Sequence, residues 1–204
     1  MIQANSHATF HVVPEVTSAV TSETEERNNF LRAAVFLTQK IYKTNLRQPL
    51  NSKIIIVADS TDLKNLDDKL WTLIPESFLP HSMEPLEPLE PLEPLEPLEF
   101  LEPSTLTRKT KLSLEIDLVS DPLKIRIEEN LFTTVIYLSG HSVPEFFFAS
   151  IKSPNATKTF HVHHVVGKNT EYREFCRTLF REYKKNGISP SSHQLDIDKA
   201  FIAH

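Results

Sequence analysis

Glycine is scarce in this sequence: Gly140, Gly167 and Gly187 are the only three among 204 residues, against 14 prolines. Loops that cradle phosphate groups need several closely spaced glycines, because the ligand approaches the backbone where a side chain would collide. Both the GxGxxG dinucleotide turn and the GxxxxGKS/T loop are therefore excluded. The length is sufficient for one globular domain with a substantial core.

Cysteine and long apolar runs are also lacking. Cys176 is the one cysteine, so no intramolecular disulfide can form, as is usual in a reducing compartment. No stretch reaches the roughly 20 apolar residues that span a bilayer. The first residues have neither the basic segment nor the long apolar segment of a secretory signal. We therefore expect a soluble, cytoplasmic protein.

The acidic charge is concentrated in one repeat. Glu84 to Pro103 contains seven Glu, six Pro and no basic residue, in EPL units that recur every three residues. Proline at this density excludes an α-helix or a paired strand and favours an extended polyproline II segment. The whole chain has 22 basic and 27 acidic side chains, a net charge of −5; without the repeat the balance is 22 to 20, or +2. The repeat is either a partner-binding or spacing arm or, as we favour, an expanded surface loop without a role.

Periodicity predicts alternating strands and helices. Apolar or β-rich runs predict strands at 8–13, 54–58, 135–138 and 160–166, and alternation at 112–118 and 123–127 predicts one or two edge strands or a hairpin. Helical spacing predicts helices that begin near 23 and 60, and a third over about 170–186. The fold class is therefore α/β: a single domain with an open, mostly parallel, Rossmann-like sheet, helices on both faces and no phosphate-binding loop.

The helix predicted over 170–186 is the most informative segment. Its apolar face is followed by an adjoining stripe of Arg173, Arg177, Phe180, Arg181 and Lys184. From Lys152 to Gly187 there are eight Lys or Arg and three Glu, a local balance of +5. Such a stripe suits an acidic peptide with an apolar end and a free carboxylate. A solvated basic face is the simpler interpretation, and composition alone favours it.

Other candidate sites are weaker. His161 and His163 share one face of a strand and His164 takes the other, so at most two of them could chelate one metal ion, and we predict no metal site. Cys176 has the spacing of a core residue. No catalytic motif occurs, and no cofactor is expected. Trp71 flanks the apolar stripe of its helix, and Phe78 follows in a proline-bounded loop, so the two aromatics are either a partner-binding anchor or ordinary packing at the edge of the core.

Three segments resemble one protein family. The run LWTLIPESFLPHSM at Leu70 to Met83 is similar to the signature of the chi subunit of bacterial DNA polymerase III holoenzyme. ATFHVV from Ala8 and RTLFREYKKNG from Arg177 to Gly187 are similar to the family near its two ends. On this resemblance, one chi-like domain spans 1–204, interrupted by a Pro/Glu/Leu repeat loop at 84–103 and with a C-terminal extension over 194–204.

The resemblance implies an accessory subunit that is not itself an enzyme but belongs to a DNA-directed DNA polymerase assembly. It implies a bridge in DNA replication, between the C-terminal tail of single-stranded-DNA-binding protein and the clamp loader, which is contacted through the psi subunit. DNA itself would be contacted indirectly, and no membrane is involved. Carried over by position, the tail-binding residues are Val166, Arg173, Arg177, Phe180 and Tyr183, and the psi-binding residues are Trp71 and Phe78. The alternatives are a degenerate nucleotide-binding or nuclease-like enzyme and a direct binder of single-stranded DNA.

Deleting Glu84 to Pro103 should leave the melting temperature within a few degrees of the full chain, because a proline-rich arm buries little apolar surface. Thermal unfolding of the two proteins, followed by circular dichroism, checks this. A large drop would mean that the repeat packs on the domain.

Overall fold

The computed structural model describes residues 7–14, 22–46, 52–73, 79–83, 115–122, 125, 132–138, 148 and 160–195. Strands and helices alternate along the chain. They are β1 (His7–Val12), α1 (Glu23–Asn45), β2 (Ser52–Val57), α2 (Ser60–Thr72), β3 (His81–Met83), β4 (Glu115–Val119), β5 (Phe132–Tyr137), β6 (Phe160–Val166), α4 (Thr170–Lys185) and β7 (Pro190–Gln194). The predicted α/β class is confirmed.

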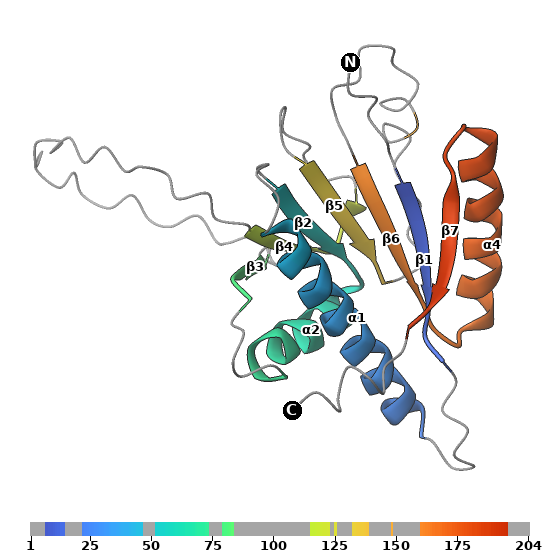
Figure 1. Cartoon of the computed structure of the whole chain (residues 1–204). Helices are drawn as coiled ribbons and strands as arrows, with labels where there is room; N and C mark the ends of the chain where they lie inside the picture. Colours follow the sequence, from blue (N-terminus) through green and yellow to red (C-terminus); the bar gives the residue numbers. More distant parts are fainter. Residues whose placement is uncertain are drawn as a thin grey trace, which may run out of the picture.

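The strands form one seven-stranded sheet in the order β3-β4-β2-β5-β6-β1-β7 (Figure 1). Each strand pairs in parallel with its neighbours. The interior strand β2 is buried on both faces: Ile54 and Ile56 belong to one core and Ile55 and Val57 to the other. Continuous apolar runs of this kind are typical of parallel sheets, whose two faces are both covered.

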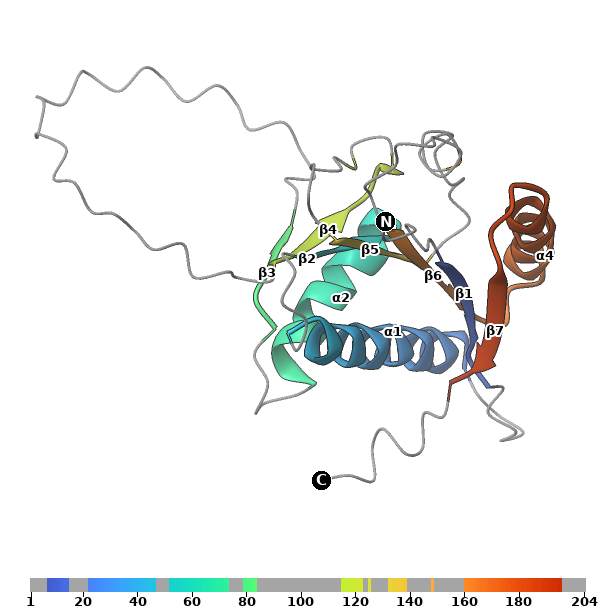
Figure 2. The same ribbon diagram turned by 45° about the horizontal axis from the view of Figure 1, so that its top comes forward.

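Helices cover the two faces separately. Figure 2 shows α1 and α2 on one face and α4 on the other side, beside β1 and β7. On the first face, Leu63 and Leu66 of α2 pack with α1 residues such as Leu37 and are fully buried or nearly so. Burial of each such leucine stabilises the fold by about 1.5–3 kcal/mol. Arg27 of α1 also pairs with the buried carboxylate of Asp62, which ties α1 to α2.

Helix α4 begins and ends with local signals in the sequence. The Asn169 side chain accepts a hydrogen bond from the backbone N–H of Tyr172 at 2.9 Å, as an N-cap does. At the other end Gly187 has φ +81°, and the N–H of Ile188 donates to the Tyr183 carbonyl at 3.0 Å. This is a Schellman ending, whose left-handed residue favours glycine.

Some strand predictions were wrong. The alternation at 112–118 produces β4, which is parallel and lies between β3 and β2, so it is neither an edge strand nor part of a hairpin. The true edges, β3 and β7, are short and polar and were not predicted. Ile125 is buried outside any strand, and Leu123 and Ile127 lie outside the described residues.

The predicted repeat loop at 84–103 also lies outside the described residues, as does the predicted C-terminal extension from residue 196 onward. Gln194 ends β7, and Leu195 packs in the core beside α1 with 8% exposure. In the described part of the chain, no helix is both long and apolar enough to cross a bilayer.

His164 links the sheet to α4 and should make the fold sensitive to acid. Its ring is fully buried between Phe10 and Tyr137, and its Nε2 lies 3.0 Å from the Tyr183 hydroxyl. Burial, with a smaller contribution from His11, lowers the pKa of His164 from 6.5 to about 3. Phe10, Tyr137 and Tyr183, the described neighbours of its ring, carry no negative charge that would stabilise an imidazolium.

We therefore expect stability to fall in mild acid. The unfolded chain takes up a proton on this histidine near its ordinary pKa of about 6.5, whereas the folded chain does not, so stability is complete above that pH and declines below it. His164 alone should lower the free energy of unfolding by about 2 kcal/mol between about pH 7.5 and pH 5. Urea denaturation at the two pH values measures this difference. His164→Gln keeps a hydrogen-bonding side chain but does not titrate; if its pH difference equals that of the parent protein, His164 is not responsible.

Candidate functional site

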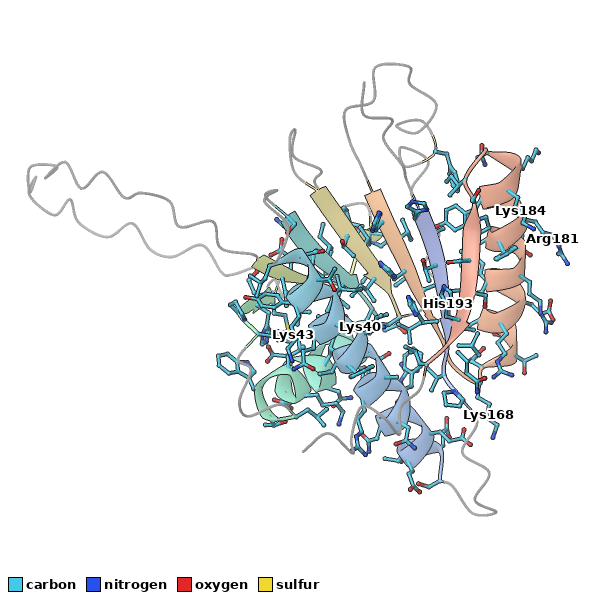
Figure 3. The ribbon with its side chains drawn as sticks, in the orientation of Figure 1. Lys40, Lys43, Lys168, Arg181, Lys184 and His193 are labelled. Atoms are coloured by element: carbon cyan, nitrogen blue, oxygen red, sulfur yellow. The ribbon has the colours of Figure 1, made fainter. Side chains whose placement is uncertain are left out.

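The exposed side of α4 carries the stripe predicted from the sequence. Arg173, Arg177, Phe180, Arg181 and Lys184 follow one another at helical spacing, and we call these five residues the α4 cationic stripe. Arg177, Arg181 and Lys184 are exposed, whereas Arg173 and Phe180 are partly buried. In Figure 3, Arg181 and Lys184 lie near the C-terminal end of α4 and project outward, away from the sheet. The stripe therefore presents cations at a surface that Phe180 makes partly apolar.

Arg173 connects the start of α4 to the end of β6. Its Nε donates a hydrogen bond to the Gly167 carbonyl oxygen at 2.8 Å. Gly167 directly follows Val166, the last residue of β6. The bond fixes the base of the guanidinium beside this strand end, so Val166 and Arg173, which the sequence placed in one site, do lie close together.

Phe180 lies between the core and the cations. Its ring centroid is 5.5 Å from that of Phe10 on β1, and the Lys184 ammonium lies 4.9 Å from the Phe180 centroid. The Lys184 contact is in the range of a cation–π interaction. An apolar group that binds here would contact an aromatic ring with a positive charge directly beside it.

Arg177 is paired within its own helix. Its guanidinium contacts the carboxylate of Glu174, three residues earlier, and both side chains are more than 60% exposed. An exposed pair of this kind contributes little to stability. A ligand carboxylate can therefore replace Glu174 at small cost.

Two of the predicted tail-binding residues are not at the surface. Val166 is 5% exposed and Tyr183 is 1% exposed. The Tyr183 hydroxyl lies against His164 in the interior, and the ring packs near Phe10. From this position Tyr183 supports the side of α4 that faces the sheet. Tyr183 would therefore influence ligand binding only indirectly, through the placement of the helix.

Trp71 presents an exposed aromatic ring at the opposite edge of the sheet. The residue is 54% exposed, and its ring centroid is 5.3 Å from that of His81 at the start of β3. His81 is held in place: its Nδ1 donates to the Leu79 carbonyl oxygen at 2.7 Å, and its Nε2 lies 2.7 Å from an Asp67 oxygen. Met83, also on β3, is 38% exposed. Phe78, the second predicted aromatic, lies outside the described residues.

Cys176 lies in the core beneath α4. Cys176 is buried, and burial raises the pKa of its thiol to about 11, which keeps it protonated and unreactive. Among the residues that the structure describes, no three His, Cys, Asp or Glu side chains are placed to hold one metal ion.

The sheet does assemble histidines that the sequence analysis did not connect: His7 and His11 of β1 and His193 of β7 lie on the same face as His161 and His163. Their spacing within each strand was visible, but their proximity depends on strand order.

Comparison with known proteins agrees with the resemblance found in the three segments. The family model described as DNA polymerase III chi subunit, HolC, matches residues 6–115. That stretch includes β1, α1 and α2, with Trp71 on α2, and it ends at the start of β4. No curated protein matches the chain. Because the family model covers more than half of the sequence, the chain belongs to the family of DNA polymerase III chi subunits, which are accessory subunits in DNA replication.

Proposed function

We propose that this chi-family protein is a non-catalytic bridge in the DNA polymerase III holoenzyme. Its α4 cationic stripe binds the acidic, Phe-ended C-terminal tail of single-stranded-DNA-binding protein, and the surface around Trp71 binds the psi subunit of the clamp-loader assembly. The observation that carries the proposal is the stripe itself: four cations line the exposed side of α4, and Phe180 lies among them. Acidic side chains and a terminal aromatic ring are the chemical complement of that surface.

The tail would bind along α4 in a defined direction. The exposed Arg177 guanidinium donates hydrogen bonds to a carboxylate of the tail in place of Glu174. Arg173 is oriented by the hydrogen bond that it donates to Gly167. The terminal Phe ring packs against Phe180, which contacts Phe10 of β1. Arg181 and Lys184 then face the acidic residues upstream of the terminal Phe (Figure 3). Exposed charges dominate this contact, so binding should weaken as salt screens them.

The positions of the two surfaces favour a bridge. Helix α4 packs beside β6 and β7, and β7 is one edge of the sheet, whereas Trp71 contacts a residue of β3, the other edge. Seven strands at about 4.8 Å spacing separate the edges by roughly 29 Å. A tail peptide on α4 and a subunit on Trp71 would therefore not compete for space.

Arg177→Ala should weaken binding of a tail peptide by about 1.5–3 kcal/mol, because it removes a charge-assisted hydrogen bond to a carboxylate. Isothermal titration calorimetry with an acidic peptide that ends in Phe measures the effect. Lys43→Ala, which removes an exposed cation on α1, is the matched control and should change the affinity little. A peptide with an amidated C-terminus should bind weakly to the parent protein, and its affinity should fall less when Arg177 is replaced. Equal affinities for the Arg177 and Lys43 variants would contradict the proposed tail site.

Trp71→Ala should reduce binding of the psi subunit by about 2 kcal/mol or more, as is usual for a central aromatic at an interface. Tail-peptide binding should stay unchanged, because the ring is at the other edge of the sheet. Co-purification and calorimetry with psi measure the loss. Leu46→Ala replaces another exposed apolar residue, 57% accessible at the end of α1, and provides the control. If the Trp71 variant binds psi like the parent protein, the psi surface lies elsewhere.

A further inference from the structure

Five imidazole rings form a continuous row on the face of the sheet that also carries α1. The rings of His7 and His161 are 5.3 Å apart, those of His161 and His163 6.4 Å, those of His163 and His11 5.1 Å, and those of His11 and His193 6.4 Å. Three neighbouring strands, β6, β1 and β7, supply them. The row is on the opposite face from His164 and α4, so it is separate from the proposed tail site.

One pair in the row is much closer than the others. The Nε2 atom of His11 lies 2.9 Å from the Nδ1 atom of His163. Two nitrogens at this separation, each about 2.0–2.1 Å from one shared ion, subtend about 90° at that ion. This is the cis angle of square-planar or octahedral coordination, which Cu²⁺ and Ni²⁺ adopt, whereas two tetrahedral zinc ligands at the same bond length would be about 3.3 Å apart.

The pair itself is largely enclosed, and the row reaches the surface at its two ends. His11 is 9% exposed and His163 is partly buried, while His193 at one end of the row and His7 at the other are exposed. Strands β1, β6 and β7 contain no Asp or Glu that could pair with the rings. Lys40 of α1 lies close enough to influence His11, and Figure 3 shows Lys40 on α1 and His193 on β7. The positive charge of Lys40 opposes a bound cation and limits the affinity.

We propose that His11 and His163 form a two-imidazole binding site for a divalent late transition metal ion with square-planar or octahedral geometry. Water molecules complete the coordination, since no third ligating side chain of the described residues converges on the pair. Neutral imidazole is the form that binds metal ions.

Binding requires both rings to turn so that their facing nitrogens point at one ion, and it requires a change of tautomer, but no net loss of protons. Without metal, one of the two rings donates its N–H to the other across the 2.9 Å contact. With metal, both facing nitrogens donate a lone pair, so the donor ring must carry its proton on the other nitrogen. The two rings hold two protons in either state.

Titration of the full chain with CuCl₂ and NiCl₂ tests the site, by calorimetry for stoichiometry and affinity and by electron paramagnetic resonance for the Cu²⁺ ligands. We expect one equivalent of ion, with hyperfine splitting from two imidazole nitrogens. His11→Gln and His163→Gln should each weaken binding by about tenfold or more, since even partners that only orient a ligand contribute 10- to 100-fold. His7→Gln, on the same strand and face as His11, is the matched control and should bind like the parent protein.

Circular dichroism of each variant establishes that it is folded, and the resonance spectrum of the unaltered protein tests the site even if a variant is not. A spectrum without nitrogen ligands, or no binding at one equivalent, overturns the proposal. An equal loss of metal affinity in the His7, His11 and His163 variants also overturns it, because a histidine-rich surface without a defined site would give that result. Tail-peptide affinity is measured independently, so neither proposal depends on the outcome of the other.

Discussion

Parallel pairing of every strand is the constraint on which the other features of this molecule depend. A parallel neighbour can be reached only by a crossover, and crossovers carry helices or long loops over the faces of the sheet. The central strands must therefore be apolar on both sides, as Ile54 to Val57 are. Two cores result, one beneath α1 and α2 and one beneath α4. The sheet separates them, so a surface built on one face is insulated from the other.

This arrangement is a Rossmann-like architecture in a sequence with too few glycines for the glycine-rich phosphate loop. Open parallel sheets commonly bind phosphates where a glycine-rich turn leads from a strand into a helix. Here the turn from β6 into α4 contains Gly167 alone, and its carbonyl oxygen accepts a hydrogen bond from Arg173. The strand end is thus used to orient a cation on the helix surface. Phe180 then lies where its ring contacts both Phe10 of the sheet and Lys184 of the stripe.

Histidine serves in three different ways in this fold, and its surroundings decide which. His164 is fully enclosed, uncharged and joined to Tyr183, so it holds α4 against the sheet. His81 is held between a carbonyl and a carboxylate and supports the ring of Trp71. His11 and His163 face each other from neighbouring strands, within the row whose two ends are exposed. The alternation of side chains along β6 places His163 and His164 on opposite faces, although they are adjacent in the sequence.

The sequence by itself determined the local features of this protein. Apolar runs and helical spacing predicted β2, β5, β6 and the helices α1, α2 and α4, because burial imposes a period on each element. The stripe on α4 was visible for the same reason, and the shortage of glycine excluded a phosphate loop.

Only the tertiary structure decided which strands are neighbours. The polar edge strand β7 has no periodic signal, and its pairing with β1 places His193 opposite His11. The exposure of Trp71 was decided in the same way, since it depends on what packs against its helix from distant parts of the chain. Period and composition are properties of neighbouring residues, whereas strand order and burial are set by contacts between residues far apart in the sequence.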